Sequence, residues 1–169
     1  MTNPDHTLPD PSEADLEALD ALGQQFLAAV ELHAHGNLDA AEDELRAILK
    51  AEPRLAEPRL LLGRILLDTS RLGDAEEHTR EALTTLEAGG QWTEDIDEKV
   101  LLGMTHAQLA EILRRTADED DVIFGDPERF QQLIQDSQTH FSKAAELDPS
   151  DETSSYYAFF MGPPPEGSA

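Results

Sequence analysis

Gly-Asn-Leu-Asp-Ala-Ala at Gly36–Ala41 and Ser-Arg-Leu-Gly-Asp-Ala at Ser70–Ala75 are the two stretches that decide the fold. The leucine in third place and the alanine in sixth place recur 34 residues apart. A fixed period of this length is typical of repeat proteins, in which each repeat is one supersecondary unit that buries its apolar face against its neighbours. The spacing therefore predicts a stack of similar units.

A third copy of the unit is interrupted. Leu101–Gly103 repeats the Leu-Leu-Gly of Leu61–Gly63 at an offset of 40 residues, and the six extra residues fit around Ala88–Trp92. The second half of the unit follows late, as Phe-Ser-Lys-Ala-Ala-Glu-Leu-Asp-Pro at Phe141–Pro149. The period therefore predicts an insertion within the third unit, at about residues 116–137.

These units resemble the tetratricopeptide repeat, a helix-turn-helix in which small residues let two antiparallel helices approach closely. The resemblance covers roughly Ala21 to Phe160. It implies an all-α fold: a right-handed superhelix of antiparallel helix pairs in about three repeats, at 22–55, 56–89 and 96–150, with a C-terminal capping helix. The residues expected to pack the repeats are Ala41, Leu62, Gly63, Ala75, Ala82, Gly103, Phe141, Ala144 and Pro149.

Apolar residues recur at three- and four-residue steps throughout the segment 12–161, which indicates helices and no strand. Asp126 followed by Pro127 is a strong start signal for one of them. Proline-rich residues 1–11 are expected to be a disordered lead, and residues 162–169 a disordered tail. The expected helices run from Ser12 to His35, Asp39 to Glu52, Glu57 to Thr69, Gly73 to Leu86, Asp95 to Arg115, Asp126 to Leu147 and Asp151 to Met161.

The composition limits the range of partners. The 169 residues carry a formal net charge of −24 with only 12 dispersed Lys and Arg, which disfavours binding to nucleic acid or to anionic lipid. There is no cysteine, no apolar run of membrane-spanning length and no signal-peptide pattern, so a cytoplasmic protein is expected. A basic partner steered by the acidic surface is one interpretation, and a merely solubilising surface is the other.

No pattern in the chain indicates catalysis, a cofactor or a resident metal. The sequence contains no phosphate-binding loop, no G-x-S-x-G nucleophile elbow and no H-E-x-x-H zinc-binding motif. His33 and His35 stand two residues apart, so on a helix they point about 200° apart. The acidic run Asp118–Asp121 lacks the glycine and the final acid of a calcium loop, where Ile123 and Arg129 stand instead. We therefore expect a protein that is not an enzyme.

In tetratricopeptide arrays, the first helices of successive units line a concave groove. The resemblance therefore implies a groove that binds a protein or peptide partner. Variants of the family that grip chaperone tails use Lys and Asn at positions where this chain has Phe26 and Val30, so that ligand is disfavoured. The groove residues expected from the register are Phe26, Val30, His33, Leu60, Arg64, Leu67, Val100 and Met104, with Ala107 beside them.

Two alternatives to the peptide-binding groove remain open. The chain's own insertion could fill the groove and leave a compact helical domain, which is conceivable because three units make a short groove. The chain could instead be an acidic metal-binding or small-ligand-binding protein that uses Asp118–Asp121 together with His140.

The last expected helix is unusually aromatic. Ser154–Met161 holds four aromatic residues, and on a helix Tyr156 and Phe160 share one face while Tyr157 lies on a neighbouring one. One face is expected to cover the last repeat. The other is expected to meet either the preceding helix, a partner or a second copy of the chain, so self-association through this helix is a further expectation.

Overall fold

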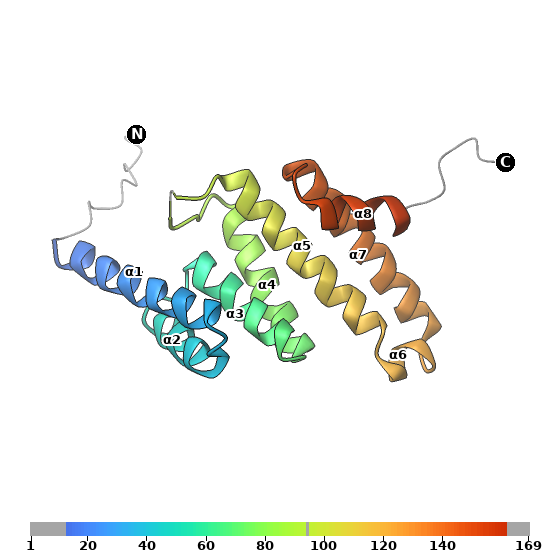
Figure 1. The fold of residues 1–169 in the computed structure, drawn as a ribbon, viewed down its shortest axis with the longest axis horizontal. Coiled ribbons are helices and arrows are strands. Elements are labelled where there is room, and N and C mark those ends of the chain that lie inside the picture. The colour runs from blue at the N-terminus through green and yellow to red at the C-terminus, as the bar shows by residue number, and fades with distance from the viewer. Residues whose placement is uncertain (1–12, 94, 162–169) are drawn as a thin grey trace, which may run out of the picture.

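The computed structural model describes residues 13–93 and 95–161, and the regular structure in these ranges is entirely helical (Figure 1). Within them, no helix has both the length and the apolar character required to cross a bilayer. The predicted lead at 1–11 and tail at 162–169 lie outside the described residues. The helices are α1 (Glu13–Ala34), α2 (Leu38–Ala51), α3 (Ala56–Asp68), α4 (Leu72–Glu87), α5 (Glu98–Ala117), α6 (Asp120–Ile123), α7 (Pro127–Leu147) and α8 (Glu152–Met161).

The helices pack mainly against their neighbours in the sequence. α1 packs on α2, α3 on α4 and α5 on α7, and these pairs are joined by contacts of α2 with α3 and of α4 with α5 (Figure 1). α8 lies on α7 at the end of the row. The all-α prediction is confirmed.

The turn that ends the first helix in each of the first two pairs recurs at the 34-residue period. Gly36 has φ of 77° and Ser70, its equivalent, has φ of 60°. In each turn, the next amide donates to a carbonyl five residues earlier, from Asn37 to Leu32 at 2.9 Å and from Arg71 to Leu66 at 2.8 Å. This is the left-handed helix terminus that satisfies otherwise unpaired carbonyls. The repeated sequence therefore encodes a repeated backbone geometry.

The insertion at 116–137 does not form a separate unit. It contains the last residues of α5, the short α6, and the first half of α7. Helix α7 begins as predicted, because the Asp126 side chain accepts a hydrogen bond of 3.0 Å from the Arg129 amide and Pro127 occupies the first helical position. α6 was not predicted, and α5 begins at Glu98 rather than Asp95 because Asp97 caps it through the Lys99 amide.

Small residues lie where the helices approach most closely. A Cβ atom placed on Gly63 of α3 would lie 2.6 Å from the Thr79 hydroxyl of α4 and 2.8 Å from the side-chain amide of Gln108 of α5. Gln108 donates to the Leu60 carbonyl at 3.0 Å and to Thr79 at 2.9 Å, so one buried amide ties three helices together. The predicted packing residues Ala41, Leu62, Gly63, Ala75, Ala82, Gly103, Phe141 and Ala144 are all buried.

Pro149 differs from the other predicted packing residues because it is exposed in the turn after α7. A proline that ends a helix acts by lacking an amide and by fixing its own backbone angle, and neither effect requires burial.

We predict that Ser70→Gly raises the free energy of unfolding by up to about 1 kcal/mol. A non-glycine residue in the left-handed region carries a steric cost of about 1–2 kcal/mol, which glycine removes. The extra entropy of glycine in the unfolded chain offsets part of this gain. Urea unfolding monitored by circular dichroism would measure the change. Gly36→Ala is the matched control and should destabilise the chain by a similar amount. A Ser70→Gly protein less stable than the parent chain would contradict this account of the turn.

Candidate functional site

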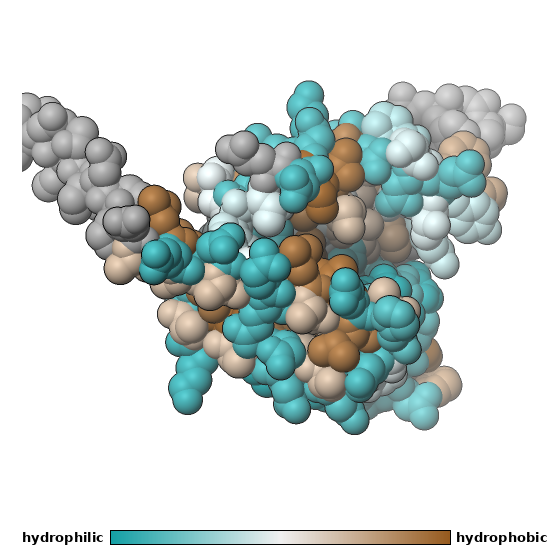
Figure 2. Space-filling model, turned by 60° about the vertical axis from the view of Figure 1, so that its left-hand side comes forward, coloured by the Kyte–Doolittle hydropathy of each residue, from teal (hydrophilic) through white to brown (hydrophobic). Residues whose placement is uncertain are grey.

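A concave cavity of about 830 Å³ lies between the first helices of the pairs. Figure 2 shows a hollow in the middle of one face in which apolar side chains gather, bordered by hydrophilic surface. Its walls come from α1, α3, α5, α7, the loop between α4 and α5, and the turn into and start of α8. The cavity is lined by Phe26, Val30, His33, Glu57, Leu60, Leu61, Arg64, Thr93, Ile96, Leu101, Met104, Ala107, Gln108, Glu111, Arg115, Phe141, Asp151, Thr153, Ser154 and Tyr157.

The structure brings most of the predicted groove residues together. Six of the eight line this cavity, and Ala107 lies with them. They come from three helices that are separate in the sequence, which is the arrangement that the repeat register predicts. The six are Phe26, Val30 and His33 of α1, Leu60 and Arg64 of α3, and Met104 of α5.

Leu67 and Val100 do not line the cavity. Leu67 is wholly buried in a core cluster that also contains Ile112 of α5, so the interpretation of Leu67 as a groove residue is wrong. Helix α3 is enclosed mainly by α2 and α4 and also contacts α1 and α5, whereas α1 has a free side, so equivalent positions on the two helices meet different surroundings. Val100 is half-buried, and α5 instead faces the cavity with residues spaced three and four apart from Leu101 to Arg115.

The α4–α5 loop forms a cavity wall that sequence reasoning missed. The carboxylate of Glu57, only 5% exposed, accepts hydrogen bonds of 2.9 and 3.1 Å from the Trp92 amide and of 2.9 Å from the Thr93 amide. The Trp92 ring packs on Phe26 of α1 with 5.7 Å between ring centroids. The extra residues of the third repeat therefore bridge α3 to α1.

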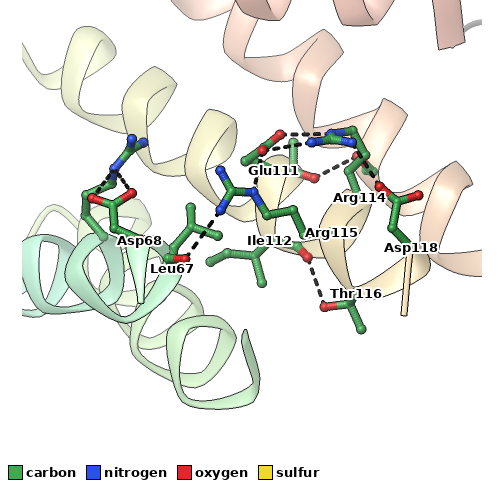
Figure 3. A network of polar contacts seen from close by, with 11 residues as sticks. Leu67, Asp68, Glu111, Ile112, Arg114, Arg115, Thr116 and Asp118 are labelled. Carbon is green, nitrogen blue, oxygen red and sulfur yellow. Dashed lines mark hydrogen bonds and ion pairs between the residues drawn. The ribbon is translucent and has the colours of Figure 1, made fainter. Parts of the chain in front are cut away.

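The two arginines that line the cavity are paired with carboxylates of the chain. Glu111 accepts hydrogen bonds from Arg114 at 3.0 Å and from Arg115 at 2.7 Å (Figure 3). Burial alone would raise the pKa of Glu111, but these two guanidinium groups outweigh it and hold the pKa below its usual range. Asp68 similarly lies 3.1 Å from Arg64 and 3.8 Å from His33. These cations are therefore already neutralised by neighbouring carboxylates.

Two histidines meet at the interface of α5 and α7. The Nδ1 atoms of His106 and His140 are 2.9 Å apart and the rings stack with 5.1 Å between centroids, so one nitrogen donates and the other accepts. Burial lowers the pKa of His140 to about 4, and the neighbouring His106 makes the second-largest contribution to this shift. Burial also lowers the pKa of His106, with Lys143 adding to the effect. Both rings are therefore neutral at pH 7.

The acidic metal site that stood as an alternative is not assembled in the described residues. The side chain of Asp118 pairs with Arg114 at 3.1 Å, and Asp120 and Asp121 form the first turn of α6. His140 contacts His106 rather than this run. Within residues 13–93 and 95–161, no three His, Cys, Asp or Glu side chains gather in a geometry that would hold a metal ion.

Helix α8 has the two faces that its aromatic residues predict. Tyr157 stacks on Phe141 at 4.7 Å and lies under the Arg114 guanidinium at 5.6 Å, so this face covers α7 and enters the cavity. Tyr156 and Phe160 lie on the outside, 57% and 65% exposed, next to Phe159. The position of Tyr157 explains why the start of α8 contributes to the cavity wall.

Comparison with known protein families and with curated proteins gives no significant match for this chain. The function is therefore argued from the geometry of the cavity.

We predict that Glu57→Ala lowers the free energy of unfolding by about 1–3 kcal/mol, because two part-buried backbone amides lose their acceptor. Thermal unfolding followed by circular dichroism gives the stability, and the emission of Trp92, the only tryptophan, reports the loop. Glu77→Ala, at an exposed position of α4, is the control. An unchanged melting temperature together with an unchanged emission maximum would show that Glu57 does not hold the loop.

A second prediction concerns pH. The pKa of His140 is lower in the folded chain than its ordinary value of 6.5, so the unfolded chain binds more protons between pH 6.5 and about 4. Stability should therefore fall as the pH drops through this window. Melting temperatures measured from pH 7 to 4.5 should fall less for His140→Gln than for the parent chain. His78, whose pKa burial also lowers, remains in both proteins, and identical slopes would contradict the prediction.

Proposed function

We propose that the chain is a non-enzymatic interaction module whose groove binds an apolar or amphipathic segment of a partner protein. One observation carries the proposal: residues chosen from the repeat register alone, on α1, α3 and α5, line a single open cavity with mainly apolar walls. A concave apolar surface of this size, with a few fixed polar groups, is typical of a binding site. It suits a peptide that places apolar side chains in the groove.

The proposal includes the tetratricopeptide-like superhelix. It is supported by the sequential packing of helix pairs, by the recurring left-handed turn at Gly36 and Ser70, and by small residues at the helix crossings. In such arrays, the first helix of each pair faces the concave side, which is where the cavity lies.

The polar groups of the cavity favour binding over catalysis. The Glu57 carboxylate accepts hydrogen bonds from two backbone amides, and Glu111 accepts hydrogen bonds from two guanidinium groups. The Gln108 side chain donates hydrogen bonds to the Leu60 carbonyl of α3 and to Thr79 of α4. A general acid or base needs a group that can exchange a proton with a substrate. These groups instead fix the shape of the walls.

The alternative in which the insertion fills the groove finds little support. None of the residues that line the cavity belongs to the segment 116–137. The insertion lengthens the α5–α7 pair beyond the cavity instead, so residues 116–137 leave the groove unfilled.

The test uses charge placed on the groove surface. Met104→Glu should weaken binding of a partner isolated with the parent chain by tenfold or more, because a buried carboxylate without a partner costs more than about 1.4 kcal/mol. Met104 is 49% exposed, so the variant should fold, whereas Leu60, only 7% exposed, packs in the core and is a poor choice. Affinity measured by calorimetry, with circular dichroism as the folding check, decides the outcome.

Ile123→Glu is the matched control, since Ile123 is also a partly exposed aliphatic residue and lies on α6, outside the cavity. It should bind the partner like the parent chain. Equal affinity of the parent chain and the folded Met104→Glu protein would place the binding site elsewhere.

A further inference from the structure

The cavity continues into a second cleft along α1. This cleft, of about 620 Å³, shares Phe26, Val30, Thr93 and Ile96 with the main cavity, so the two form one trough past the α4–α5 loop. The second cleft is further lined by Leu16, Leu19, Asp20, Gly23, Gln24, Leu27, Trp92 and Asp95. We call the combined surface the trough.

The floor of the trough is apolar beyond the predicted groove. Leu16 and Leu27 are more than half exposed, and Val30 and Ile96 are exposed by 39% and 38%. Leu16, Leu27 and Val30 belong to α1 and Ile96 to the facing loop, and all four line the second cleft. Large apolar side chains that gather in a concave surface mark an interaction site rather than ordinary solvated surface.

Along the trough, the cations are paired with carboxylates, whereas several carboxylates are not paired with cations in the described residues. The cations are matched within the chain, Arg64 by Asp68 and Arg115 by Glu111. Asp20 and Asp95 are exposed in the second cleft, and among the described residues neither forms an ion pair with a cation. Asp151, at the other end, caps α8 through Ser154 and forms no ion pair within the described residues. The unbalanced charge at both ends is therefore negative.

We propose that the occupant of the trough is a peptide segment in which apolar residues are flanked by Lys or Arg. This inference rests on the proposed peptide-binding function and adds the chemistry of the partner. Basic side chains would meet Asp20 and Asp95 while the apolar ones enter the trough, which is the complementarity that steers and orders protein partners. A second copy of the chain does not fit, because two molecules of net charge −24 repel each other.

The experiment is a selection from a random 16-residue peptide library displayed on phage, with the immobilised full chain as bait. The same library is selected in parallel on Met104→Glu, so that peptides attracted only by the acidic surface are removed. Enriched peptides are synthesised, and their affinities are measured through the emission of Trp92, which lies in the trough wall. Titrations at two salt concentrations separate the electrostatic part of binding.

The expected result is enrichment of peptides with Lys or Arg beside apolar residues, which bind more weakly at high salt. The double variant Asp20→Asn/Asp95→Asn should lose about threefold to tenfold in affinity, as is usual for two exposed charges at an interface. The control is Asp43→Asn/Glu77→Gln, which makes the same charge change at exposed positions of α2 and α4, outside the trough. It should bind the peptides like the parent chain.

The two proposals fail in different ways. Neutral or acidic peptides that bind the parent chain and not Met104→Glu would overturn the basic preference and leave the groove function standing. Equal affinity for the two double variants would also overturn the role of Asp20 and Asp95. A library that gives no peptide preferring the parent chain to Met104→Glu would overturn the groove function itself.

Discussion

The close approach of three helices at Gly63 is the constraint on which the rest of the structure depends. Because position 63 has no side chain, the Thr79 hydroxyl and the Gln108 amide come within hydrogen-bond distance of each other against the α3 backbone. Each of them would lie less than 3 Å from a Cβ atom at this position, which a packed core does not tolerate. Helix α3, which also packs on α2, is therefore held against α4 and α5 at this point, and its residues Glu57, Leu60, Leu61 and Arg64 contribute to the groove.

The periodic part of the fold could be predicted from the sequence, because each repeat reuses the same helix faces and the same turn. That is why Phe26, Leu60 and Met104 could be assigned to one surface before any coordinates were known. Leu67 could not be assigned correctly, since the enclosure of α3 depends on α5, a helix distant in the sequence. The Glu57 contact to the α4–α5 loop was equally hidden, because a carboxylate that accepts from two backbone amides leaves no periodic pattern in the side chains.

The acidic character of the chain has two separate roles in this structure. Inside the groove, carboxylates such as Glu111 neutralise the few guanidinium groups and hold them against the walls, so the surface presented to a ligand is mainly apolar (Figure 3). At the ends of the trough, Asp20, Asp95 and Asp151 pair with no cation in the part of the chain that the structure describes, so their field extends into solvent. The chain can therefore carry a large net charge and still have an apolar site. The carboxylates inside the groove are paired with guanidinium groups, and the unbalanced ones lie at the ends of the trough.

Each helix packs mainly on its neighbours in the sequence, and this arrangement also bears on which wall of the groove is held least firmly. Helix α1 is the first in the row, is supported chiefly by α2, and meets the rest of the groove wall through its contacts with α3 and through the contact of Phe26 with Trp92. In linear arrays, stability is approximately a sum of terms for each unit and each interface, so the terminal element unfolds locally at the lowest free energy. We therefore expect amide hydrogens of α1 to exchange with solvent earlier than those of α3, and a ligand that bridges α1 and α5 as proposed would slow that exchange by linking the first helix to the rest of the row.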